Sequence, residues 1–161
     1  MALEDVLSSV DPDLSAFRAH NGKLIHYHGT TDAAIPSGNS IEIRRSVLAF
    51  FGTYDQKDTK DTVSNFYRLF LVPGMQHCSG GPGANTFGQG VPLADSAHDV
   101  IKALEAWVEQ GKAPDQIIAT KYTNDDPTQP ALFTRPLCPY PALARWNGTG
   151  DAADAANWSC R

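Results

Sequence analysis

The stretch KLIHYHGTTDAAIP, residues 23–36, decides the fold of this chain. Its first six residues are bulky and lie between Gly22 and Gly29, which is typical of a strand buried on both faces of a parallel sheet. Gly29 allows a tight turn, and Asp32 follows four residues after the strand. Open α/β folds gather their functional groups at the carboxyl ends of their strands. The stretch therefore predicts a sheet strand with a carboxylate at its functional end.

The segments after this strand alternate between helix and strand patterns. Apolar residues at helical spacing predict a helix over 40–51 that stops at Gly52, and a polar connector over 55–61 follows. A second strand is predicted over 66–72, where a Pro-Gly pair at 73–74 ends it. One crossover helix between two strands is the pattern of a parallel pair.

The second half of the chain begins with a loop over 80–90 that is too rich in glycine for regular structure. The clearest helix pattern covers 95–110, with Asp95 or Ser96 as its cap and Gly111 directly after its end. The apolar stripe of this helix consists of Val100, Leu104, Trp107 and Val108. This stripe is expected to pack on the sheet, with Trp107 in the core.

A short third strand is predicted over 117–122, and proline and alanine dominate from Asn124 onward, which predicts a tail of coil. The order of elements favours an α/β fold with a narrow, mainly parallel sheet, flanking helices and a long coil tail. So few strands leave both faces and an edge of the sheet to be covered, so the fold is expected to be incomplete without further strands. The aromatic residues expected to anchor the tail are Tyr140, Trp146 and Trp158.

Length and charge exclude several function classes. The 161 residues fit one ordinary domain of roughly 100–150 residues. Thirteen Lys and Arg stand against eighteen Asp and Glu with no basic block, so we expect no nucleic acid as a partner. No apolar run approaches the ~20 residues of a membrane span, and residues 1–17 lack the pattern of a signal peptide. We therefore expect no membrane partner either.

Asp32 and His77 each follow a predicted strand, and 45 positions separate them. That distance allows one crossover helix, and a right-handed crossover would bring the two loops within reach of each other. A carboxylate beside an imidazole holds its tautomer and supports the imidazolium, as in a catalytic triad. Alternatively, Asp32 is a surface residue in a turn or a helix cap. The pair favours a triad acid and base over that interpretation.

A nucleophile for such a triad is not found. The sequence contains no G-x-S-x-G motif, and Ser79 lies in a Gly-Gly loop rather than in a strand-to-helix elbow. His26 and His28 alternate on one strand and so face the same side, but no third ligand at a suitable spacing supports a metal site. No metal ligand and no bound cofactor are therefore expected in this chain.

Four segments of the chain resemble the tannase and feruloyl esterase family. They are HGTTDAAIP (28–36), FYRLFLVPGMQHCSGGPGANTFG (66–88), ALEAWVEQGKAPDQIIATK (103–121) and RPLCPYPALARWNGTGDAADAANWSC (135–160). Members of this family are α/β-hydrolases that cleave esters of phenolic acids. The resemblance implies that Asp32 is the triad acid, that His77 is the triad base, and that the substrate is a small-molecule phenolic ester.

The three cysteines, Cys78, Cys138 and Cys160, lack the close spacing of a zinc or redox site, and an odd number leaves one thiol over. The family resemblance implies a bridge between Cys138 and Cys160. It also implies that Cys78 pairs with a cysteine that precedes the nucleophilic serine and is absent from this chain. Disulfides of this kind imply a secreted or periplasmic protein.

The family places its early strands, oxyanion donors, nucleophile and lid before the segment seen here. The resemblance thus implies that residues 1–161 are a C-terminal portion of the catalytic domain, inactive in isolation, with the family's calcium site in the absent lid. Two origins stay open: a fragmentary gene product, whose partner would be the missing N-terminal portion as a separate chain, or a piece cut from a longer protein. The alternative is a non-catalytic module or gene remnant. Asn147 and Asn157 lie in N-glycosylation sequons, whose use the sequence leaves open.

Overall fold

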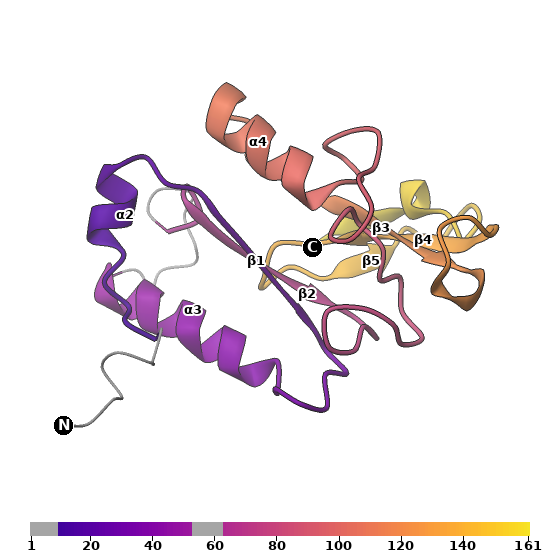
Figure 1. Cartoon of the computed structure of the whole chain (residues 1–161), viewed down its shortest axis with the longest axis horizontal. Helices are drawn as coiled ribbons and strands as arrows, with labels where there is room; N and C mark the ends of the chain where they lie inside the picture. Colours follow the sequence, from indigo (N-terminus) through magenta and orange to yellow (C-terminus); the bar gives the residue numbers. More distant parts are fainter. Residues whose placement is uncertain (1–9, 53–62) are drawn as a thin grey trace.

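The computed structural model describes residues 10–52 and 63–161 (Figure 1). The predicted connector over 55–61 lies outside the described residues, as do the first nine residues. The helices in chain order are α2 (Ser15–Ala19), α3 (Gly38–Phe50) and α4 (Val100–Gln110), with 3₁₀ turns η1 (Thr123–Asp125) and η2 (Ala155–Asn157). The strands are β1 (Leu24–Gly29), β2 (Tyr67–Val72), β3 (Ile117–Tyr122), β4 (Ala131–Leu137), β5 (Ala144–Trp146) and β6 (Trp158–Cys160).

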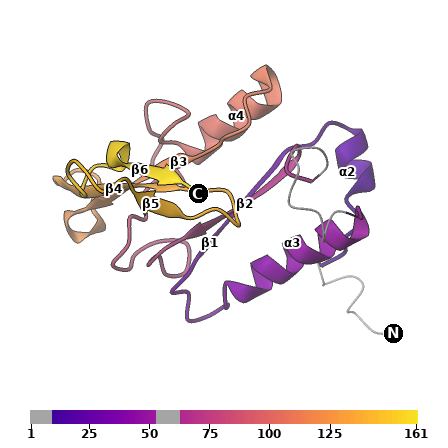
Figure 2. The ribbon, with the colours of Figure 1, turned by 180° about the vertical axis from the view of Figure 1, so that it is seen from behind.

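A parallel pair of strands forms the centre of the chain. β1 pairs with β2 in register from Leu24 opposite Tyr67 to Gly29 opposite Val72, and α3 is part of the connection between them. Figures 1 and 2 show α3 on one side of this pair and α4 on the other. The predicted strand–helix–strand unit is thus confirmed, and so is its narrow parallel sheet.

Strand β2 separates two apolar clusters. Phe70 and Val72 belong to the cluster that contains residues of α4, β3 and β4, while Tyr67 and Leu69 belong to the cluster that contains Val47 of α3. Successive side chains of a strand point to opposite faces, which is why one strand supplies both clusters. β2 is therefore the strand that is buried on both faces.

Strand β1 is less buried than the sequence pattern predicts. Its first five residues are half-buried, and only Gly29 is buried. Within residues 10–52 and 63–161, β1 pairs with β2 alone, so its other edge has no strand beside it. The prediction of a strand covered on both faces is wrong for β1 in this chain.

Helix α4 begins five residues later than predicted. Its cap is Asp99, whose carboxylate accepts hydrogen bonds from the amides of Ile101 at 2.8 Å and Lys102 at 3.0 Å, rather than Asp95 or Ser96. Asp99 is 1% exposed, and it also accepts from the Leu93 amide, so a buried contact fixes the start. The helix ends at Gly111 with φ +68° and buries Trp107, as predicted, whereas Val108 is exposed.

The tail is not coil. β3 pairs with β4 in an antiparallel ladder instead of joining the parallel sheet, and β5 pairs with β6. Proline interrupts the pattern of β4, and three-residue strands show no periodicity, which is why the sequence did not reveal them. The sheets are therefore of mixed type rather than mainly parallel.

Two of the predicted aromatic anchors fix this tail. Tyr140 packs beside the α3 cluster, and its amide donates to the Leu69 carbonyl of β2 at 2.7 Å. The Trp158 ring lies 4.2 Å from the Arg135 guanidinium. Trp146 is 45% exposed and does not act as an anchor among the described residues. In the same described ranges, no helix has the length and apolar character that crossing a membrane requires.

Candidate active site

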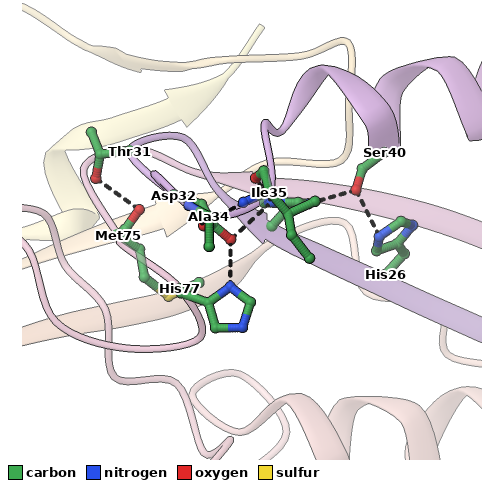
Figure 3. Close-up of polar contacts among 9 residues, drawn as sticks. His26, Thr31, Asp32, Ala34, Ile35, Ser40, Met75 and His77 are labelled. Carbon is green, nitrogen blue, oxygen red and sulfur yellow. Dashed lines mark hydrogen bonds and ion pairs between the residues drawn. The ribbon is translucent and has the colours of Figure 1, made fainter.

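Asp32 and His77 lie together at the carboxyl ends of β1 and β2 (Figure 3). His77 Nδ1 donates a hydrogen bond of 2.8 Å to Asp32 Oδ2, and the other ring nitrogen points away from Asp32. The Asp32 side chain is 4% exposed and that of His77 is 57% exposed. The arrangement holds a buried acid against an imidazole whose second nitrogen is accessible.

The other oxygen of Asp32 caps its own turn. Oδ1 accepts from the amides of Ala34 at 2.8 Å and Ile35 at 3.0 Å. The Ile35 bond is the main cause that lowers the pKa of Asp32 to about 2, burial opposes it, and bonds from His77 and Ala34 lower it further. Asp32 is thus a turn cap and the partner of His77 at once, and it is ionised at neutral pH.

We expect Asp32 to stabilise the fold in a pH-dependent way. Its pKa of about 2 lies below the ordinary 3.8, so its contribution is complete above about pH 4 and is lost as the pH falls through about 2. Urea unfolding of the chain and of its Asp32→Asn variant across this pH range measures the contribution of Asp32 to the free energy of unfolding. The difference in unfolding free energy between the two should shrink toward low pH, and a constant difference would contradict the expectation.

Two threonines that sequence reasoning missed tie the Asp32 loop to the His77 loop. The amide and Oγ1 of Thr31 both donate to the Met75 carbonyl, at 3.0 and 2.8 Å. The Gly74 amide donates to Thr30 Oγ1 at 3.0 Å. The adjacent threonines between strand and acid were the available signal in the sequence, because hydroxyls bond readily to nearby backbone.

Gly29 makes this close approach possible. A Cβ at this position would overlap the backbone carbonyl oxygens of Met75 and Gln76. The sequence predicted a tight turn at Gly29, but the structure shows that the position is also crowded by the second loop. The Asp32–His77 contact therefore depends on a glycine three residues before the acid.

Replacement of Gly29 by alanine is expected to lower the free energy of unfolding by about 1–3 kcal/mol, the usual cost of overpacking. Urea unfolding measures this difference. Gly38→Ala is the matched control, because a Cβ there meets nothing within 4 Å. A Gly29→Ala variant as stable as the Gly38→Ala variant would contradict the crowding.

Cys138 and Cys160 form the disulfide that the family resemblance implies, and it joins the ends of β4 and β6. Cys78, directly after His77, is an exposed free thiol with φ +63°, a backbone conformation that residues other than glycine rarely adopt. Burial and then the neighbouring Cys78 raise the pKa of Tyr27. The free thiol thus belongs to the residue that follows the accessible histidine in the sequence.

An open hollow of about 490 Å³ lies at His77. Its lining residues are Thr31, Ala33, Ala34, Gln76, His77, Ser79 and Gly80. Ser79 shares this hollow, but in the part of the chain that the structure describes, the His77 ring has no hydrogen bond except that to Asp32. The structure therefore brings acid and imidazole together and leaves the second ring nitrogen without a hydroxyl partner in these ranges.

The strand histidines are hydrogen-bonded to a serine of helix α3. Ring nitrogens of His26 and His28 lie 3.0 and 2.6 Å from Ser40 Oγ. Among residues 10–52 and 63–161, no three or more His, Cys, Asp or Glu side chains gather in a way that could hold a metal ion. These two histidines belong to a hydrogen-bonded row behind the acid.

Known proteins are similar to this chain in sequence and in fold. Residues 1–161 match the family model described as tannase and feruloyl esterase. Over 98% of this chain, an uncharacterized esterase of Xanthomonas campestris is 46% identical. Over 92% of it, the mono(2-hydroxyethyl) terephthalate hydrolase of Piscinibacter sakaiensis is 42% identical. A crystal structure of an esterase from Aspergillus oryzae superposes over 94% of the chain with a TM-score of 0.83 and 36% identity.

All three proteins are longer than the aligned segment. This chain spans 29% of the Xanthomonas esterase, 21% of the Piscinibacter hydrolase and 29% of the Aspergillus structure. The structural match shows that the parallel pair, its helices and the antiparallel strands recur as a unit within a larger esterase.

Proposed function

Because this chain belongs to the tannase and feruloyl esterase family, we propose that it supplies the acid and the histidine of a serine carboxylic-ester hydrolase. The observation that carries the proposal is the 2.8 Å hydrogen bond from His77 to the buried Asp32. In this proposal the chain is the C-terminal part of an α/β-hydrolase domain, and a further strand pairs with the free edge of β1.

The chemistry follows from the protonation of the two groups. Asp32 is ionised and accepts from Nδ1 of His77, so the neutral ring has an unprotonated Nε2. That nitrogen takes the proton of a serine hydroxyl as the serine attacks the ester carbonyl, and the Asp32 charge stabilises the imidazolium that forms. The imidazolium then protonates the departing alcohol, and water resolves the acyl-enzyme by the same proton transfers.

The nucleophilic serine of this proposal lies outside the 161 residues. No G-x-S-x-G motif is present in them, and no hydroxyl bonds to the His77 ring in the described ranges. We place Cys78 in a disulfide with a cysteine that precedes that serine, which would tie the nucleophile to the His77 loop. The exposure of Cys78 supports this pairing.

The substrate class in this proposal is an ester of a phenolic or other aromatic acid. The description of the family and the name of the Piscinibacter relative, a hydrolase of an aromatic ester, support it. The compartment is an oxidising one, secreted or periplasmic, which the Cys138–Cys160 disulfide supports.

A chimera tests the proposal. Residues 10–161 replace the matching segment of the Xanthomonas esterase, and hydrolysis of methyl ferulate, methyl gallate and mono(2-hydroxyethyl) terephthalate is measured for the chimera and for the chain alone. We expect turnover of at least one ester by the chimera and none by the chain alone. A folded chimera that cleaves no ester, while the Xanthomonas enzyme does, would contradict the proposal.

A second candidate is a non-catalytic module that pairs with another chain, and the missing nucleophile motif favours it. In that case the chain alone would be inactive, and so would a folded chimera. The chimera assay therefore separates the two candidates.

The state of Cys78 gives a further prediction. Under non-reducing, native conditions, the chain alone should take up one alkyl group from iodoacetamide, because Cys78 is free and exposed. The chimera should take up none at Cys78, since its thiol would be bonded to the upstream cysteine. Peptide mass spectrometry measures the alkylation of Cys78 in both proteins. Alkylated Cys78 in an active chimera would contradict the proposed bridge.

A further inference from the structure

Side chains behind the acid form a continuous hydrogen-bonded row. Tyr67 Oη lies 2.9 Å from His26 Nδ1, and His26 Nε2 lies 3.0 Å from Ser40 Oγ. Ser40 Oγ is in turn 2.6 Å from His28 Nδ1. Figure 3 shows His26 and Ser40 to the right of the Asp32 turn and the His77 ring below it. The row thus ends at His28, whose ring reaches the same carboxylate oxygen of Asp32 that His77 contacts.

The last member of the row contacts the turn that holds Asp32. His28 Nε2 lies 2.9 Å from the Ile35 carbonyl oxygen and 3.3 Å from Asp32 Oδ2. Both of these atoms are acceptors only, so Nε2 of His28 must carry a proton. The same Ile35 donates its amide to Asp32 Oδ1. His28 therefore holds the peptide turn that fixes the carboxylate.

With both histidine rings neutral, one direction of hydrogen-bond donation gives every polar atom of the row a partner. Since Nε2 of His28 is protonated, its Nδ1 accepts from the Ser40 hydroxyl, and Ser40 Oγ then accepts from Nε2 of His26. His26 Nδ1 is left to accept from the Tyr67 hydroxyl. Every donation along the row runs toward the acid.

The surroundings of His26 and Tyr67 favour a neutral ring and a protonated hydroxyl. Burial is the main cause that lowers the pKa of His26, and burial raises the pKa of Tyr67 to about 12. Ser40 is 3% exposed, Tyr67 0% and the His28 side chain 13%. An open hollow borders His26, His28 and Ser40, so the acceptors at the His28 end of the row, rather than exclusion of water, fix the direction of donation.

We propose that His28 is a positioning residue for the Asp32–His77 pair. In its neutral form with the proton on Nε2, held by Ser40, it fixes residues 32–35 so that Asp32 Oδ2 faces His77 Nδ1. A neutral donor suits this place, because an imidazolium there would set a second cation against the carboxylate that must stabilise the His77 imidazolium. The contacts of His28 with the Asp32 turn lie within this chain, whereas their consequence for catalysis rests on the proposed function.

Long-range proton–nitrogen correlation spectra of the 161-residue chain at neutral pH test the tautomer. The ring signals are assigned with His26→Gln and His28→Gln. We expect both rings to be neutral, with protonated Nε2 and bare Nδ1. A proton on Nδ1 of His28, alone or together with one on Nε2, would overturn the proposal. This result does not depend on any esterase activity.

Two substitutions then test positioning. His28→Leu keeps bulk and removes the donor, whereas the amide of His28→Gln can donate from the place of Nε2. In the chimera, we expect His28→Leu to lower kcat by about 10–100-fold with little change in KM, the size of effect that misplacement causes. His28→Gln should recover most of this loss. The downfield Nδ1 proton of His77 in the chain should weaken in the leucine variant and return in the glutamine variant.

His98→Leu is the matched control, since His98 pairs with Asp95 and has no bond to the row. It should leave kcat and the His77 signal unchanged. Equal losses in the leucine and glutamine variants would show that the shape of histidine matters rather than its donor, and would overturn the proposal. If the wild-type chimera is inactive, the proposed function fails, while the tautomer and the His77 signal still decide the role of His28.

Discussion

The His77→Ala variant of the chimera is expected to lose about a million-fold in kcat, the size of loss seen when a serine hydrolase loses its base. Without the ring, nothing takes the serine proton or returns it to the leaving alcohol. Steady-state hydrolysis of the best ester in the panel measures this, with KM expected to change little. The large effect follows because one imidazole performs both proton transfers.

His20→Ala is a fitting control for this experiment, because the His20 ring is bonded to the Ala16 carbonyl and is exposed. It should leave turnover unchanged. A His77→Ala chimera that retains more than about a hundredth of the activity would show that another base operates, since general acid–base assistance alone is worth about 10²–10⁴-fold.

The second large effect is expected from Asp32→Asn, at about 10⁴-fold in kcat. If the amide oxygen of the asparagine takes the place of Oδ1 in the turn, its NH2 group faces His77 Nδ1. An NH2 group donates and does not accept, so Nδ1 is no longer held in its protonated form and the ring can adopt the wrong tautomer. The amide oxygen can take the place of Asp32 Oδ1 in the turn, so the variant should still fold at neutral pH, although with a lower unfolding free energy. Kinetics of the chimera and its circular dichroism measure the two separately.

Asp95→Asn provides the control, because Asp95 accepts from His98 Nδ1 at 2.9 Å in a second, exposed Asp–His pair. Its removal should leave turnover unchanged. If both variants had the same modest effect, Asp32 would be no more than a turn cap, which was the alternative that the sequence left open.

The parts of the fold that the sequence predicted are those with a clear local pattern. The bulk of β1 and β2 and the helical spacing of α3 placed these elements to within two residues. The start of α4 could not be chosen in this way, because Asp95 and Asp99 are both capable caps. The choice is made by the loop before the helix, where Gly88 leaves room for the Asp99 carboxylate.

The pairing of β3 with β4 was hidden for a different reason. Pro136 lies within β4, and a proline argues against a strand unless the strand lies at an edge. The tail is also held by contacts distant in sequence, such as Tyr140 to Leu69 and the Cys138–Cys160 bridge. Local patterns carry no information about such contacts.

The candidate site, too, could be predicted from the sequence only in part. Asp32 and His77 could be paired from the sequence, because parallel strands joined by one crossover end at the same edge. The row behind them could not, since it needs Tyr67 of β2, 41 positions from His26, and Ser40 on the helix between the two strands. Likewise, the sequence shows Gly29 but not the second loop that packs against it.

A crystal structure of the chimera tests most directly whether this chain supplies the base for a serine outside it. The account predicts that Nε2 of His77 lies within about 2.6–3.2 Å of that serine hydroxyl, the range that proton transfer requires, while Nδ1 remains bonded to Asp32. A serine found on another rim of the sheet, with the His77 ring facing only solvent, would contradict it.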